Sequence, residues 1–124
     1  MNRDFEEMLA ALSEAGADFM VIGAHAVAIH ATPRATGDLD IWVRPTPANA
    51  ARVWVALTAF GAPLHELTRD DLTSDDLVYQ IGVAPNRIDL LTTIGGVTFD
   101  DAWPRRTTVA LWGLSVPVIG RDDL

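Results

Sequence analysis

The stretch Thr36-Gly37-Asp38-Leu39-Asp40-Ile41-Trp42-Val43 places two carboxylates two residues apart at the start of an apolar run. In a β-strand, residues i and i+2 point to the same face, so Asp38 and Asp40 would project together. The alternating residues would face a core on the other side: Leu39, Ile41 and Val43. Two adjacent carboxylates repel each other and are costly to bury without a partner. The pattern therefore predicts a cation between Asp38 and Asp40.

A glycine at a strand-to-helix junction comes shortly before this stretch. Residues 18–23 predict a short buried strand that ends at Gly23, and the alanine-rich residues 24–31 predict a helix. Such a junction can receive phosphate, because the glycine lets the backbone approach and the free N–H groups of the helix point outward. A single glycine is also compatible with an ordinary tight connection, so by itself it decides little.

A third carboxylate stands inside a later strand. Residues 78–83 and 87–91 predict two antiparallel strands, and Asp89 would face away from its apolar neighbours, on the same side as Arg87. An acidic residue in the middle of an inner strand is uncommon without a partner. Arg87 could neutralise Asp89 as a simple ion pair, although that pairing leaves the earlier carboxylate pair unexplained.

The other predicted elements complete an alternation of helices and strands. Thr46 and Pro47 predict the start of a helix that runs to about Phe60, with Gly61 as its stop. Within the last predicted strand, Pro117 indicates an edge position. The remaining ranges are a helix over residues 3–15, a short helix over 98–103, and a hairpin of 107–112 with 114–119.

Composition limits the function classes. The chain has 124 residues, no cysteine and a formal net charge of −8, which predicts one domain over residues 1–124 and excludes disulfides and thiolate metal sites. An extended nucleic acid is disfavoured, because gripping its backbone needs a basic patch. A nucleotide that brings its own magnesium remains compatible. With no apolar run of about 18 residues and no signal-peptide pattern, we expect a cytoplasmic protein with no membrane partner.

Taken in order, these features resemble the nucleotidyltransferase superfamily, whose pattern is a Gly-Gly or Gly-Ser turn, then Asp-x-Asp, then a distant third Asp in a strand. Within the superfamily, the closer likeness is to small bacterial nucleotidyltransferase-like proteins related to the abortive-infection AbiEii toxins. The resemblance covers nearly the whole chain and rests on Val21-Ile22-Gly23-Ala24-His25-Ala26, Pro33-Arg34-Ala35-Thr36-Gly37-Asp38-Leu39-Asp40-Ile41-Trp42, Pro85-Asn86-Arg87-Ile88-Asp89-Leu90-Leu91 and Val116-Pro117-Val118-Ile119-Gly120. It implies an α/β (α+β) nucleotidyltransferase fold, with a mixed β-sheet and helices packed mainly on one face.

The resemblance also implies a reaction. A nucleoside monophosphate would move from a nucleoside triphosphate, with ATP as the expected donor, to a hydroxyl of a protein or small-molecule acceptor. Two Mg²⁺ ions would be held by Asp38, Asp40 and Asp89 as the catalytic and metal-binding residues, since Mg²⁺ prefers oxygen ligands. Asp38 and Asp40 would bridge the ions. Asp89 would complete the site of the ion that activates the acceptor hydroxyl, and could take its proton.

The nucleotide would bind at the predicted turn. The resemblance implies that Gly23 and Ala24 hold the β- and γ-phosphates, and that Thr36 and Arg34 could add phosphate contacts. Ala24 departs from the family pattern, because it has no hydroxyl and adds a methyl group where glycine has none. Related chains also continue into C-terminal helices after the region of Gly120, so we expect a domain without those helices, whose cleft an oligomer could complete.

Two classes of function remain open. One is a magnesium-dependent nucleotidyltransferase, in which a toxin–antitoxin partner could be the acceptor. The alternative is a catalytically weak or inactive protein of the same fold that binds a nucleotide or a partner. Ala24 and the short C-terminus favour the alternative, whereas three clustered carboxylates favour the enzyme. Metal-dependent phosphate-ester hydrolysis would use similar ligands, but His25 and His30 do not supply the histidine-rich motif it would need.

Overall fold

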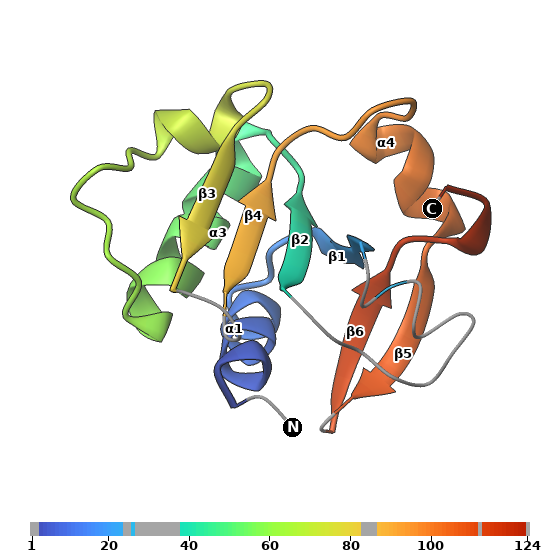
Figure 1. The fold of residues 1–124 in the computed structure, drawn as a ribbon, viewed down its shortest axis with the longest axis horizontal. Coiled ribbons are helices and arrows are strands. Elements are labelled where there is room, and N and C mark those ends of the chain that lie inside the picture. The colour runs from blue at the N-terminus through green and yellow to red at the C-terminus, as the bar shows by residue number, and fades with distance from the viewer. Residues whose placement is uncertain (1–2, 24–25, 27–37, 83–86, 112, 124) are drawn as a thin grey trace.

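A mixed six-stranded β-sheet forms the framework of the protein, which we describe from a computed structural model (Figure 1). The structure describes residues 3–23, 26, 38–82, 87–111 and 113–123. The helices and strands are α1 (Arg3–Glu14), β1 (Phe19–Ile22), β2 (Leu39–Val43), α3 (Pro47–Phe60), β3 (Val78–Ile81), β4 (Ile88–Leu91), α4 (Phe99–Ala102), β5 (Thr107–Leu111) and β6 (Leu114–Val118). Short 3₁₀ turns cover Asp70–Thr73, Trp103–Arg105 and Arg121–Asp123.

The strand order is β3-β4-β2-β1-β6-β5. The pairs β2–β4 and β1–β6 are parallel, and the other neighbouring pairs are antiparallel. This arrangement brings β2 and β4 side by side, although α3 and β3 lie between them in the sequence. The mixed sheet expected from the sequence is confirmed.

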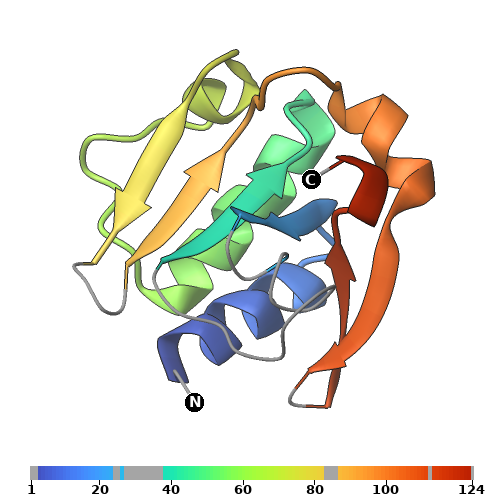
Figure 2. The same cartoon turned by 45° about the vertical axis from the view of Figure 1, so that its right-hand side comes forward.

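Helices α1 and α3 lie together on one face of the sheet (Figures 1 and 2). α3 begins where predicted, because the Thr46 hydroxyl accepts the backbone N–H of Asn49 at 3.3 Å. It ends at Gly61, which adopts a left-handed conformation with φ of 88°. α1 buries residues at helical spacing: Phe5, Met8, Leu9 and Leu12. No helix in the described ranges is both long enough and apolar enough to cross a membrane.

The two faces of β2 have different surroundings along the strand. Its alternate apolar residues are all buried: Leu39, Ile41 and Val43. On the other face, Trp42 is buried as well, because Phe99 from α4 meets it edge-on with ring centroids 5.1 Å apart. Asp40, which precedes Trp42 on that face, is only half-buried. The second face is therefore apolar toward the end of β2 and polar at its start.

The expectation that Pro117 marks an edge strand is wrong. β6 lies between β1 and β5, and β5 is the edge. The N–H of Ile119 donates to Val21 on β1, so position 117, two residues earlier, also directs its nitrogen toward β1. Pro117 has no N–H to donate there, and among the described residues β1 pairs with β6 at Val21 opposite Val118.

Candidate functional site

Two of the predicted carboxylates are direct neighbours across the parallel strands β2 and β4. Asp40 is the register partner of Asp89, so both side chains project from the same face at adjoining positions. The row continues to Ile22 on β1, opposite Asp40, and to Gln80 on β3, opposite Asp89. Asp38 lies two residues before Asp40 and on the same face. The structure thus brings together all three carboxylates that the sequence analysis selected.

The predicted glycine turn lies against this row. Gly23 follows β1 with φ of 72°, and a Cβ built on it would fall 2.3 Å from Oδ2 of Asp40. Only a residue without a side chain leaves room for the carboxylate in this arrangement. The other predicted phosphate-binding residues lie outside the described residues: Ala24, Arg34 and Thr36, with His25 and His30.

Arg87 supplies positive charge at the carboxylates. Its terminal Nη2 donates a hydrogen bond to Oδ2 of Asp38. Its Nε lies 3.4 Å from Oδ1 of Asp89, close enough for an ion pair. The ion pair of Arg87 with Asp89 that the sequence allowed is therefore present, and Asp38 shares the same guanidinium. Alternation along β4 predicts that Arg87 and Asp89 share a face, whereas the contact with Asp38 depends on the register of β4 against β2.

The contact between Arg87 and Asp89 is incomplete. Nε of Arg87 and Oδ1 of Asp89 are both buried, and neither has a hydrogen-bond partner in the described part of the chain. A buried polar atom left without a hydrogen bond costs about 1–3 kcal/mol. As the side chains stand, no three His, Cys, Asp or Glu groups among the described residues are arranged to hold a metal ion. The donor type nevertheless fits Mg²⁺, which takes carboxylate oxygens, and Asp89 has one oxygen that no hydrogen bond from the described residues uses.

A pocket of about 520 Å³ lies at the other end of β2. It is lined by the ends of β2 and β4 and by the segment around α4, with Trp42, Thr92 and Phe99 among its walls. Arg44, which also lines it, is six residues beyond Asp38, or about 20 Å along an extended strand. Of the predicted site residues that the structure describes, none lines this pocket.

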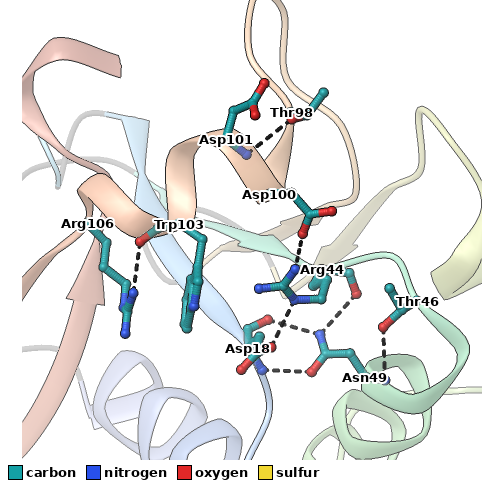
Figure 3. A network of polar contacts seen from close by, with 9 residues as sticks. All are labelled: Asp18, Arg44, Thr46, Asn49, Thr98, Asp100, Asp101, Trp103 and Arg106. Atoms are coloured by element: carbon teal, nitrogen blue, oxygen red, sulfur yellow. Dashed lines mark hydrogen bonds and ion pairs between the residues drawn. The ribbon is translucent and has the colours of Figure 1, made fainter.

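The polar residues near the pocket form a network that joins neighbouring elements (Figure 3). Arg44 donates to Oδ2 of Asp18 at 2.9 Å, and another of its nitrogens bonds to Asp100. Its guanidinium carbon lies 4.7 Å from the ring centroid of Phe99. Buried Asn49 adds hydrogen bonds to the backbone at both Asp18 and Arg44. We did not predict this network from the sequence, although an asparagine on the apolar face of α3 is a signal for it. The contacts of Asn49 indicate a structural role.

Comparison with known proteins supports the fold. No protein-family model matches the sequence, and no curated protein sequence matches it. Among solved structures, the chain is similar to the crystal structure of a putative nucleotidyltransferase from Thermotoga maritima, with a TM-score of 0.66 and 14 % sequence identity. The match covers 99 % of this chain and 82 % of the other. At this identity the likeness shows a shared fold, which confirms the expected fold class.

Proposed function

We propose that the protein is a nucleotidyltransferase that moves a nucleoside monophosphate from a nucleoside triphosphate to an acceptor hydroxyl. The observation that carries this proposal is the register pairing of Asp40 with Asp89, with Asp38 on the same face and Gly23 against Asp40. A structural role alone gives little reason for three carboxylates on one face, since acidic neighbours repel. The fold shared with the Thermotoga maritima structure supports the same class of reaction.

The three carboxylates would form the metal site. Asp38, Asp40 and, from the neighbouring strand, Asp89 would hold the two ions. Two Mg²⁺ ions, when bound, would supply the positive charge that stabilises the attacking and leaving oxygens of an in-line displacement. Gly23 contributes by leaving the space that the Asp40 carboxylate occupies.

The chemical step would use Asp89 as the proton acceptor. The acceptor hydroxyl oxygen would form a bond to the α-phosphorus while the bond from that phosphorus to the β-phosphate bridging oxygen breaks. The hydroxyl proton would pass to the carboxylate of Asp89 on the neighbouring strand. Pyrophosphate would leave, and the nucleoside monophosphate would remain on the acceptor.

The charge of the chain favours one kind of acceptor. At a net charge of −8, a protein or small-molecule hydroxyl is a more suitable acceptor than an extended RNA. ATP is the proposed donor, and a toxin–antitoxin partner is the proposed protein acceptor. Both assignments rest on the family resemblance described above.

One observation favours a second candidate function. Arg87 contacts two of the three carboxylates and partly neutralises them. A protein whose site is neutralised in this way could bind a nucleotide or a partner without transferring anything. The two functions differ in whether pyrophosphate is released.

The test uses ATP labelled at the α-phosphate, Mg²⁺ and candidate acceptors, including the product of the adjacent reading frame. We expect wild type and the exposed control Asp122→Asn to label an acceptor and release pyrophosphate. Asp40→Asn, which removes a proposed metal ligand, should lose at least about a hundredfold in rate. ATP binding by wild type without pyrophosphate release would favour the binding module instead.

A further inference from the structure

We propose that the guanidinium of Arg87 is the resident cation of the carboxylate site and leaves that site when a divalent metal ion binds. This inference rests on the proposed function, because it assigns a regulatory contact to the same carboxylates. In the metal-free protein, this arginine would offset part of the negative charge of the site. Metal binding would then be an exchange of one cation for another.

The contacts of Arg87 place it where a metal ion would have to bind. It reaches Asp38 before β2 and Asp89 on β4, so a single side chain connects carboxylates from two segments. The exposed fraction of the side chain is 37 % for Arg87, 23 % for Asp38 and 12 % for Asp89. Of these three side chains, the arginine is therefore the most exposed and the nearest to water.

The backbone of Arg87 stays in place during such a movement. Its carbonyl accepts the N–H of Leu39 at 3.1 Å, the first hydrogen bond of the parallel pair that continues as β2 and β4. The register of Asp40 with Asp89 depends on this ladder and not on the guanidinium. Displacing the side chain of Arg87 would thus free carboxylate oxygens while leaving the carboxylates on their strands.

The incomplete ion pair favours exchange. Nε of Arg87 and Oδ1 of Asp89 are buried 3.4 Å apart, without a hydrogen bond in the described structure. A divalent ion would give Oδ1 a ligand contact, and water would give Nε a hydrogen-bond partner. Each unsatisfied atom gains a partner when Arg87 leaves and the ion enters.

Electrostatic repulsion prevents the guanidinium and the metal ion from occupying the site together. A guanidinium and a divalent ion that contact the same carboxylate would repel each other at short range. The more strongly Arg87 binds the carboxylates, the more it lowers their affinity for the metal ion. By the same factor, the metal ion weakens the binding of Arg87. Removing the guanidinium should strengthen metal binding while weakening the metal-free fold.

The first experiment titrates MgCl₂ into the protein without nucleotide, by calorimetry, for wild type, Arg87→Gln and Arg52→Gln. Arg52 is exposed on α3, and Arg52→Gln removes one positive charge, as Arg87→Gln does. We expect Arg87→Gln to bind Mg²⁺ about fivefold more tightly or better than wild type, and to unfold at a lower temperature without metal. Arg52→Gln should bind like wild type. Unchanged or weaker binding by Arg87→Gln would overturn the proposal.

A second measurement uses wild type alone, so it does not depend on how well a variant folds. In wild type labelled with ¹⁵N-arginine, the Nε–H resonance of Arg87 should shift and broaden as Mg²⁺ saturates the site, because the group passes into water. If the Arg87 resonance stays unchanged when Mg²⁺ saturates the site, the guanidinium repels the ion without leaving its position. That result would overturn the proposed displacement of Arg87, even if Arg87→Gln bound Mg²⁺ more tightly.

The outcomes separate this inference from the proposed function. If neither wild type nor Arg87→Gln binds Mg²⁺, the metal site fails and the exchange fails with it. If wild type binds Mg²⁺ and transfers a nucleotide while Arg87→Gln has an unchanged dissociation constant, the proposed function stands and the exchange alone is refuted.

Discussion

The Cα of Gly23 lies against the carboxylate of Asp40, so closely that a Cβ at position 23 would fall 2.3 Å from Oδ2 and 3.2 Å from Cγ. This contact joins the end of β1 to the adjoining strand at the row of acidic side chains. It gives the glycine a steric role, separate from the phosphate-binding role that we propose for this turn. The Asp40 carboxylate can keep its position beside Asp89 only while residue 23 has no side chain.

A matched pair of glycine substitutions tests this contact. Gly23 and Gly16 have φ of 72° and 71°, but a Cβ added to Gly16 would meet no atom within 4 Å. Gly16→Ala should cost only the strain of the left-handed backbone, about 1 kcal/mol of unfolding free energy. Gly23→Ala should cost clearly more, about 2–4 kcal/mol, because the methyl group also displaces Asp40. Urea unfolding of both variants measures the difference, and equal costs would contradict the contact.

Asn49→Ala should destabilise the protein by about 2–4 kcal/mol, because the part-buried N–H of Asp18 and carbonyl of Arg44 lose the hydrogen bonds that Asn49 makes to them. Asn49 is 2 % exposed, and its side chain accepts the N–H of Asp18 at 2.7 Å. It also donates to the carbonyls of Asp18 and Arg44, each at 3.0 Å. Arg52→Ala on the same helix, at an exposed position, should change stability by no more than about 0.5 kcal/mol. Thermal unfolding of the two variants compares them, and similar costs would contradict a structural role for Asn49.

The ion pair of Arg105 with Asp123 predicts a pH dependence of stability. Hydrogen bonds from Arg105, at 2.8 and 2.9 Å, lower the pKa of Asp123 below its ordinary value. A carboxyl whose pKa is lower in the folded state stabilises the fold above the unfolded-state value, near pH 4, and loses that contribution as pH falls through the lowered pKa. Wild type should therefore be more stable than Asp123→Asn at pH 6, and the gap should close toward pH 2.

A double-mutant comparison isolates this ion pair. In an Arg105→Gln background, Asp123→Asn should remove no further pH-dependent stability, since the hydrogen-bond donor that lowers the pKa of Asp123 is absent. Urea unfolding at several pH values measures both backgrounds. A gap between wild type and Asp123→Asn that stays constant from pH 6 to pH 2 would argue against the ion pair.

Local patterns were sufficient for most individual elements. Alternation over residues 38–43 correctly placed Leu39, Ile41 and Val43 in the core, because strand geometry repeats every two residues. Capping chemistry correctly located both ends of α3, since Thr46 and Gly61 satisfy backbone groups that any helix leaves open. These features depend only on residues close together in the sequence.

The sequence pattern could not predict which residues of distant strands pair with each other. The pairing of Asp40 with Asp89 depends on how two distant segments align in a parallel ladder, and no local pattern specifies that alignment. The second partner of Arg87 follows from the same register. Pro117 misled the prediction for a similar reason, because its missing N–H limits the pairing with β1 without making β6 an edge strand.

The most direct test of the account is the thermal unfolding of wild type and Asp40→Asn, each with Mg²⁺ alone, ATP alone and both together. A ligand at about 100 times its dissociation constant stabilises a protein by about 2.7 kcal/mol, which corresponds to a rise of roughly 10 °C for a chain of this size. We predict that rise for wild type with Mg²⁺ and ATP together, and little or none for Asp40→Asn. An unfolding temperature of wild type that does not respond, or an equal rise in both proteins, would contradict a nucleotide site built on these carboxylates.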